Sequence, residues 1–210
     1  MASLDSVRVF VGLKPCTEIR VYGANEKDII GIVGYEKEHP LSPYQECFFK
    51  YNGLDMYSVK MAMAYEKALF CLNNELANKI LRTHYSEEAR DINKMLRIAD
   101  NEKEDWFKYK DAKLLKILEA KFTPRHDYYR MRSWLTSYDN AKLAFLARVD
   151  ENGEIIEKNE YYGISIPPHH PDIYNPNKWN QYGKNMIGKL LENIRDNTYE
   201  IKLRRKNKSI

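Results

Sequence analysis

The chain has 210 residues, of which 43% are hydrophobic, and this size suits one domain, or at most two, with a substantial core. Its formal net charge is +4, but the last ten residues hold five cations and no acid. The rest of the chain therefore carries a net charge of −1, which excludes a body that is basic throughout. No apolar run approaches the length of a membrane span, so we expect no membrane partner.

The first six residues lack the basic and apolar regions of a signal peptide. The three cysteines, Cys16, Cys47 and Cys71, are an odd number at unpatterned spacings. These features predict a reduced, intracellular protein located in the cytoplasm.

Short β-branched runs at the start of the chain predict two or three strands within 7–12 and 19–35, with turns at 23–25 and at Gly34. Apolar residues at helical spacing then predict three helices, over 58–82, 86–99 and 104–122. In the third helix, Phe107, Leu114, Ile117 and Leu118 are expected to face inward.

Pro124 ends the third helix, and a short fourth helix is expected over 128–135. Residues 144–149 and 154–157 predict a β-hairpin, because Asn152 and Gly153 lie at the turn between them. Four prolines within 166–178 argue against regular structure there, and the last long helix is expected over 183–195.

No repeat and no clear linker interrupt the chain, so we expect one compact α+β domain that is predominantly helical. Residues 1–35 are a strand-rich extension of this domain, 36–196 its main part, and 197–210 a basic tail. The tail is either a solvated terminus or a phosphate-binding segment, and nucleic-acid binding through it is the less favoured interpretation.

Three sequence blocks occur in an order typical of one family. The first block runs from 41–44 through 52–53 to 57–68. The second runs from Asp105–Trp106 to Lys121–Phe122. The third consists of 161–164, Asp172, Pro176, Trp179 and 183–188. The chain is similar in these blocks to the NADAR superfamily, the YbiA-like N-glycosidases, which act on riboflavin-pathway intermediates and on ADP-ribose linked to nucleobases. The resemblance implies a compact NADAR-like domain, and we expect its blocks to converge on one pocket.

The resemblance also implies a small ligand, an ADP-ribose-like nucleotide or a ribosyl phosphate, and hydrolysis of its ribosyl N-glycosidic bond where catalysis is retained. It implies no metal and no cofactor. The catalytic candidate is Lys67, and the candidates for substrate binding are Ser42, Tyr44, Lys60, Trp106, Tyr162, Gly163 and Asn185. The sequence does not indicate an oligomeric state.

Several polar positions of the family pattern are replaced in this chain. Lys60 stands where the family normally has Glu, and Met61 and Ala64 stand where it often has His and Gln. Lys60 and Lys67 share one helix face, which either binds an anion, lowers the pKa of one lysine, or is simply solvated. A neutral Lys67 would be a nucleophile able to form a Schiff base with an opened ribose.

Two further candidates have a structural alternative. Trp106 either stacks on a planar base or anchors the core, since only one of Trp106 and Phe107 can face inward. Asn185 either donates to a phosphate or ribose oxygen at a helix start or caps that helix without a ligand. His169 and His170 with Asp172 invite a metal site, but adjacent histidines in an extended loop diverge and no second cluster supports them.

The sequence thus leaves two classes of function open. One is an N-glycosidase with altered catalytic groups. The other is a catalytically inactive NADAR-fold protein that sequesters a nucleotide or docks on a partner.

Overall fold

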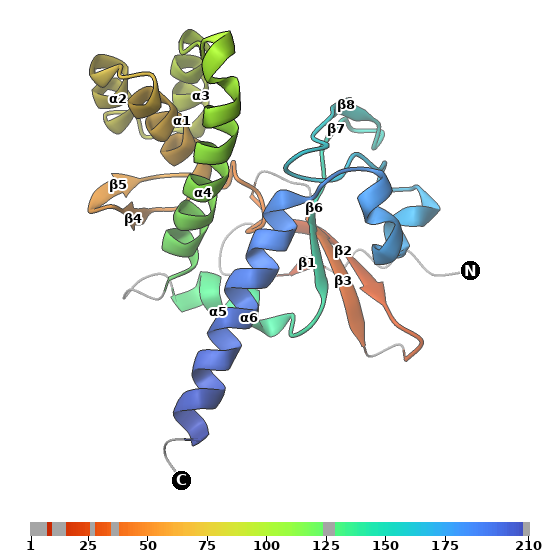
Figure 1. Ribbon diagram of the computed structural model, residues 1–210. Coiled ribbons are helices and arrows are strands. Elements are labelled where there is room, and N and C mark those ends of the chain that lie inside the picture. Colours follow the sequence, from red (N-terminus) through yellow and green to blue (C-terminus); the bar gives the residue numbers. More distant parts are fainter. Residues whose placement is uncertain (1–7, 10–15, 26–27, 35–37, 124–128, 208–210) are drawn as a thin grey trace. The chain divides into compact units, whose positions relative to one another are not determined.

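The computed structural model describes residues 8–9, 16–25, 28–34, 38–123 and 129–207. Contacts divide the chain into two compact units. One, which we call the sheet unit, comprises Met1–Ser42 and Arg130–Ile210; the other, the helical unit, comprises Pro43–Tyr129 (Figure 1). The elements confirm the α+β class predicted from the sequence.

The sheet unit is built on four strands in the order β1-β2-β3-β6. Their bounds are β1 Arg8–Val9, β2 Cys16–Tyr22, β3 Ile29–Gly34 and β6 Lys142–Phe145. β2 pairs antiparallel with β3, whereas β6 pairs parallel with β3. Helix α6 (Met186–Asn207) packs on β6 (Figure 1). The N-terminal strands confirm the strands expected within 7–12 and 19–35, as far as these residues are described.

The remaining elements of the sheet unit are short: α5 Tyr129–Ser137, β7 Arg148–Val149, β8 Ile155–Glu157, and the 3₁₀ helices η2 Pro171–Tyr174 and η3 Pro176–Gln181. The hairpin prediction was too long, because residues 142–145 join the main sheet and only β7 pairs with β8. The prolines of 166–178 do not exclude helical turns either. Each of η2 and η3 begins with a proline, where the missing N–H costs no hydrogen bond.

The core of the sheet unit combines residues of the N-terminal strands with residues of the third sequence block. Val21 and Val33 come from the N-terminal strands, and Trp179 comes from η3; all three are buried in one cluster with residues of β6 and 164–173. The Trp179 indole N–H donates to the carbonyl of Ile173 at 3.0 Å. This bond satisfies the polar atom of a ring that the core otherwise surrounds.

The helical unit starts with a tight hairpin, β4 Phe49–Tyr51 and β5 Leu54–Met56. Asn52 and Gly53 form its turn with φ of 50° and 81°, the left-handed region that these two residues tolerate best. The helices follow as α1 Val59–Phe70, α2 Asn74–Leu81, α3 Ser86–Met95, η1 Asp100–Glu102 and α4 Lys103–Phe122. α1 contacts α2, α3 and α4, so it is the central helix of this unit.

The prediction of a single helix over 58–82 is wrong, because the helix is interrupted between α1 and α2. Leu72 adopts a φ of 52°, and the side chain of Asn73 accepts from the N–H of Leu76 at 2.9 Å. Asn73 is therefore the N-cap of a new helix. The helices expected over 86–99 and 104–122 are confirmed as α3 and α4, although α3 ends at Met95.

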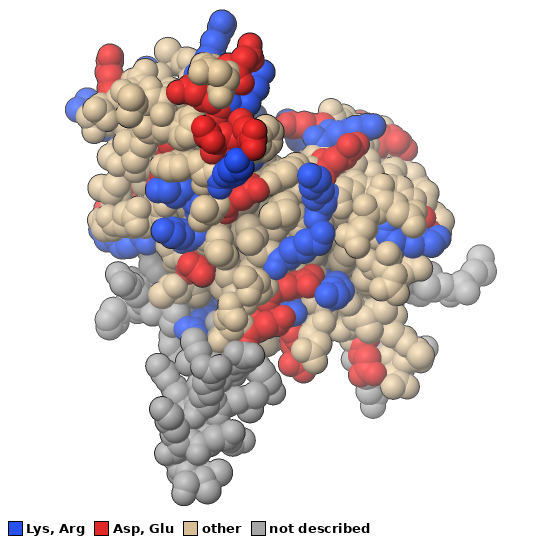
Figure 2. Space-filling model, viewed as in Figure 1, with Lys and Arg blue, Asp and Glu red and all other residues tan. Residues whose placement is uncertain are grey.

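The last helix is longer than expected. α6 continues to Asn207, so the backbone of 197–207 is helical. The cationic side chains of the tail lie outside the described residues, and its binding function stays a prediction. Over the described residues visible in Figure 2, cationic and anionic side chains are interspersed. None of the described helices is both long and apolar enough to cross a membrane.

Candidate functional site

The first candidate pair, Lys60 and Tyr44, comes together at the start of α1. The hydroxyl of Ser58 accepts from the N–H of Met61 at 3.0 Å and so caps the helix. The N–H of Lys60 donates to the carbonyl of Pro43 at 3.0 Å, which holds the preceding loop against the helix start. The Lys60 Nζ then lies over the Tyr44 ring, 4.7 Å from its centroid. The structure therefore places an ammonium and an aromatic ring side by side at the start of a helix.

The catalytic candidate, Lys67, is engaged at the other end of α1. Its Nζ donates to the carbonyls of Leu96 at 2.8 Å and Asn93 at 3.3 Å, at the C-terminal end of α3. Burial lowers the pKa of the Lys67 ammonium, but carbonyl acceptors at a helix C-terminus favour its charged form. This geometry gives Lys67 a structural role in capping α3.

Of the neighbours Trp106 and Phe107, only one faces inward, as expected, but it is Trp106 and not Phe107. The Trp106 ring packs on Phe70 at 5.2 Å and lies 5.9 Å from Tyr109, centroid to centroid. Phe107 is 48% exposed, so its predicted inward position is wrong. The contacts of Trp106 favour its interpretation as a core anchor.

A buried carboxylate that the sequence analysis did not single out lies one residue before Lys67. Glu66 accepts from the hydroxyls of Tyr51 at 2.7 Å and Tyr109 at 2.6 Å, and the Lys113 ammonium lies 2.9 Å from it. Burial alone would raise the pKa of Glu66, but these donors outweigh it and hold the pKa below its usual range. Burial and Glu66 together raise the pKa of Tyr51 far above its usual value.

One sequence signal could have revealed this network. Glu66 follows Val59 and Ala62 at helical spacing, and all three are buried. An acid within an apolar helical stripe requires partners, because an isolated carboxylate is costly to bury. The identity of the partners could not be predicted, since Tyr51 and Tyr109 come from other elements.

In the sheet unit, Asn185 fastens the start of α6 to β6. Its side-chain amide donates to the carbonyl of Leu143 at 2.7 Å and accepts from the N–H of Phe145 at 3.3 Å. Asn185 is buried and has a φ of 51°. A Cβ at Gly188 would collide with the Leu143 carbonyl, which explains the small residue one turn later. Helix–strand packing thus accounts for Asn185 and Gly188 of the 183–188 block.

The first amides of α6 are also occupied. The N–H groups of Asn185, Met186 and Ile187 donate to the carbonyls of Gly163, Tyr161 and Tyr162. These bonds bring two other candidates, Tyr162 and Gly163, to Asn185. They also use the amides on which the phosphate interpretation of Asn185 relied. Ser42 is buried in the same unit, and its N–H donates to the carbonyl of His39 at 2.8 Å.

Comparison with known proteins gives one family and one fold. The model of the NADAR domain matches residues 34–198. The chain belongs to the NADAR family. The fold is similar to the NMR structure of the E. coli protein YbiA, with a TM-score of 0.58 and 19% identity over 88% of this chain and 96% of that one. No curated protein matches the chain.

The NADAR match, over 34–198, includes the helical unit and most of the sheet unit. Within it, two of the three positions at which the resemblance implied polar side chains lie in the core. Met61 is fully buried and Ala64 nearly so. The convergence of Lys60 and Lys67 with Asn185 on one pocket stays a prediction, because these residues belong to different units.

A second buried carboxylate, Glu18, lies on β2, before the residues that the NADAR model matches. It accepts from the Tyr138 hydroxyl and from Arg20 Nε, both at 2.6 Å. His39 Nδ1 accepts from the N–H of Leu41, so Nε2 carries the proton that faces Glu18 at 3.4 Å. Burial raises the pKa of Glu18, but these hydrogen bonds outweigh it and lower the pKa. The network ties the N-terminal strand to the NADAR domain.

The histidines of the Pro-rich loop have separate partners. His170 Nδ1 accepts from the N–H of Asp172, whereas His169 lies 3.6 Å from Glu154. Asp172 is engaged by Lys178 at 2.6 Å and by the Tyr182 hydroxyl at 2.7 Å. Among the described residues, no group of three His, Cys, Asp or Glu side chains could hold a metal ion.

Proposed function

We propose that this NADAR protein binds an ADP-ribose-like or ribosyl-phosphate ligand at the start of α1, through Lys60 and Tyr44. The observation that carries the proposal is the Lys60 ammonium, 4.7 Å from the centroid of the Tyr44 ring. An ammonium attracts phosphate oxygens, and a tyrosine adds an amphipathic ring beside it.

The electrostatics of α1 support an anionic ligand. The first turn of this helix contains no acid, and Lys60 places a positive charge there. A cation at a helix N-terminus opposes the helix dipole, whereas an anion is stabilised by it. A phosphate bound beside Lys60 would interact favourably with both the ammonium and the helix dipole. The carboxylate that the family has at this position could not bind a phosphate in this way.

The contacts of the neighbouring charged groups favour binding over catalysis. A Schiff base requires a neutral amine, but two main-chain carbonyls accept from the Lys67 ammonium. The Glu66 carboxylate is engaged by two hydroxyls and an ammonium, so it is poorly placed to serve as a general base. Hydrolysis through Lys67 remains the second candidate, because burial lowers the pKa of this lysine.

Calorimetry with ADP-ribose and ribose 5-phosphate tests the proposal. We expect the wild type to bind with micromolar-class affinity, about −8 kcal/mol. Lys60→Met should weaken both ligands by about tenfold to a hundredfold, since a charge-assisted phosphate contact contributes about 1.5–3 kcal/mol. Lys50→Met is the matched control, because Lys50 Nζ also lies over an aromatic ring, 5.7 Å from the centroid of Phe48.

The same protein should release no base from ADP-ribosylated guanine or from a ribosylamino-pyrimidine phosphate. Absence of wild-type binding to both ADP-ribose and ribose 5-phosphate would refute the proposal. Turnover that Lys67→Ala abolishes would establish the second candidate instead.

A further inference from the structure

Strand β6 lies at the end of the four-stranded sheet, with β3 on one side of it. The N–H of Leu146, just beyond β6, donates to the carbonyl of Gly34 in β3 at 2.9 Å. Main-chain groups of successive strand residues point to opposite sides, so those of the odd-numbered residues within 141–147 point away from β3. A strand edge of this kind pairs with another chain unless something covers it.

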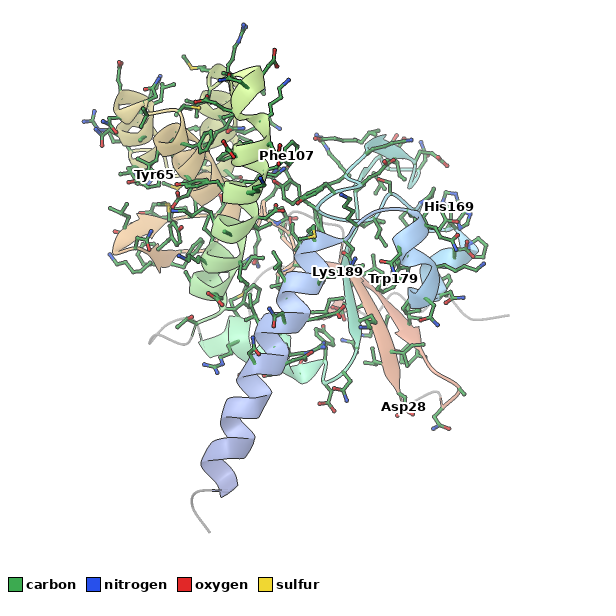
Figure 3. All side chains as sticks on the ribbon, viewed as in Figure 1. Asp28, Tyr65, Phe107, His169, Trp179 and Lys189 are labelled. Atoms are coloured by element: carbon green, nitrogen blue, oxygen red, sulfur yellow. The ribbon has the colours of Figure 1, made fainter. Side chains whose placement is uncertain are left out.

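Two side chains of α6 bind the beginning of this edge. Arg195 Nη1 donates to the carbonyl of Ala141 at 2.6 Å, and Glu192 Oε1 accepts from the N–H of Leu143 at 2.8 Å. Arg195 is buried, so its bond to the strand is shielded from water. Figure 3 shows this part of α6, on which Lys189 is labelled, running alongside β6.

Two further residues complete the edge. The Asn185 side-chain amide donates to the carbonyl of Leu143 and accepts from the N–H of Phe145. Ile164 then donates its N–H to the carbonyl of Phe145 and accepts from the N–H of Ala147, both at 2.9 Å. A group that bonds one carbonyl and the N–H two residues later reproduces the hydrogen bonds of a neighbouring parallel strand. The side chains of α6, continued by Ile164, therefore occupy the place of a fifth strand.

The spacing of the α6 residues explains how one helix can do this. Asn185, Gly188, Glu192 and Arg195 follow one another at helical spacing, so they share the face that lies on β6. Gly188 lets the helix approach closely, because a Cβ there would collide with the carbonyl of Leu143. The polar side chains on either side of Gly188 then reach the main chain of the strand.

The covered segment is itself suited to pairing with a copy of itself. Residues 141–147 are Ala-Lys-Leu-Ala-Phe-Leu-Ala, with one charge and neither proline nor glycine. Short apolar segments of this kind associate through strand pairing when their edge is exposed. We infer that α6 is a cover that blocks self-association through β6. When the cover is loosened, the edge of β6 takes segment 141–147 of a second copy of this chain as an added strand.

Glu192→Ala tests the cover, because it removes the acceptor of the Leu143 N–H. Glu192→Gln is the matched control. It loses the ion pair with Lys142, as the alanine variant does, but keeps a side-chain oxygen that accepts from Leu143. In light scattering at increasing protein concentration, we expect the molar mass of Glu192→Ala to rise. The wild type and Glu192→Gln should keep a constant mass over the same range.

Hydrogen exchange of the Leu143 amide, followed by NMR, locates the contact. In dilute Glu192→Ala this amide should exchange at least about tenfold faster than in the wild type, since it has lost a charged acceptor. In concentrated Glu192→Ala its protection should return, because the N–H then donates to a second copy. Glu192→Gln should exchange like the wild type at both concentrations.

Two outcomes would overturn the inference. One is a folded Glu192→Ala variant whose mass stays constant over the whole concentration range. The other is association that leaves the exchange of Leu143 independent of concentration, which would place the contact elsewhere. If circular dichroism shows that Glu192→Ala does not fold, Arg195→Met, which frees the carbonyl of Ala141 at the end of the edge, replaces it, and a constant mass of that variant counts equally against the cover.

Discussion

Lys67 and Leu96 join the end of α1 to the end of α3, through a hydrogen bond of 2.8 Å from Nζ to the main-chain carbonyl. The second bond of Lys67, to the carbonyl of Asn93, lies in the same last turn of α3. The last carbonyls of a helix have no partner within the helix, and a cation there also interacts favourably with the dipole. Lys67 was the catalytic candidate from the family resemblance, but capping α3 is a structural reason for a lysine at this position that requires no catalysis.

The first prediction concerns this lysine. Lys67→Met should lower the free energy of unfolding by about 1–2 kcal/mol, because two carbonyls lose a charged donor. Lys67→Arg keeps a cation and should recover part of that loss. Urea titration followed by circular dichroism measures both. Treatment of wild type and ribosyl ligand with borohydride should give no adduct; a trapped adduct that Lys67→Met removes would show that the lysine is a nucleophile.

The second prediction reverses the charge at the start of α1. Lys60→Glu restores the side chain typical of the family and suits the helix dipole, so the variant should be folded and at least as stable as the wild type. It should bind ribose 5-phosphate about tenfold more weakly or worse, since a carboxylate repels the phosphate. Calorimetry and a melting curve on one sample measure both effects. Unchanged affinity would remove Lys60 from the binding site.

The helices could be predicted from the sequence because their signals are local. Apolar spacing predicted α3 and α4, and a proline after Phe122 marked the end of α4. The break at Leu72 could not be predicted, because leucine is a good helix former and nothing in its type favours a φ of 52°. Asn73 was the one local signal of the break, because asparagine favours the N-cap of a helix and here interrupts an apolar stripe.

The site residues were harder to predict than the helices, because their roles depend on partners distant in the sequence. The motif around Asn185 was correctly singled out, but the carbonyl of Leu143, 42 residues away, uses its amide. Glu66 was missed because Tyr109, 43 residues on, supplies one of its partners. Periodicity locates a side chain on a face, whereas only the fold determines which side chains meet there.

The third prediction tests the structural role of Asn185. Asn185→Ala removes both hydrogen bonds to β6 and places an alanine at a φ of 51°, so it should cost about 2–4 kcal/mol of stability. Asn185→Gly removes the same bonds but tolerates the positive φ, and should cost less. Denaturant titration of the three proteins gives the difference. If Asn185→Ala is as stable as the wild type but loses ligand, Asn185 is a ligand-binding residue instead.

The fourth prediction is a pH dependence that originates at Glu66. Its side chain is 1% exposed, and the donors around it hold its pKa in the folded protein below the 4.5 of an unperturbed carboxyl. A lowered pKa means that the folded protein prefers the charged form, so the stabilisation is fully present above pH 4.5 and is lost as pH falls through the folded pKa. Glu66→Gln should lower the free energy of unfolding by about 1–3 kcal/mol at pH 7, and this difference from the wild type should shrink below pH 4.5.

Asp91→Asn is the control for this prediction. Asp91 also has a lowered pKa, because of Lys94, but it is solvent-exposed, so its substitution should change stability little. Urea unfolding at pH 7 and pH 3 measures these differences, and a Glu66→Gln deficit that is the same at both values would contradict the assignment.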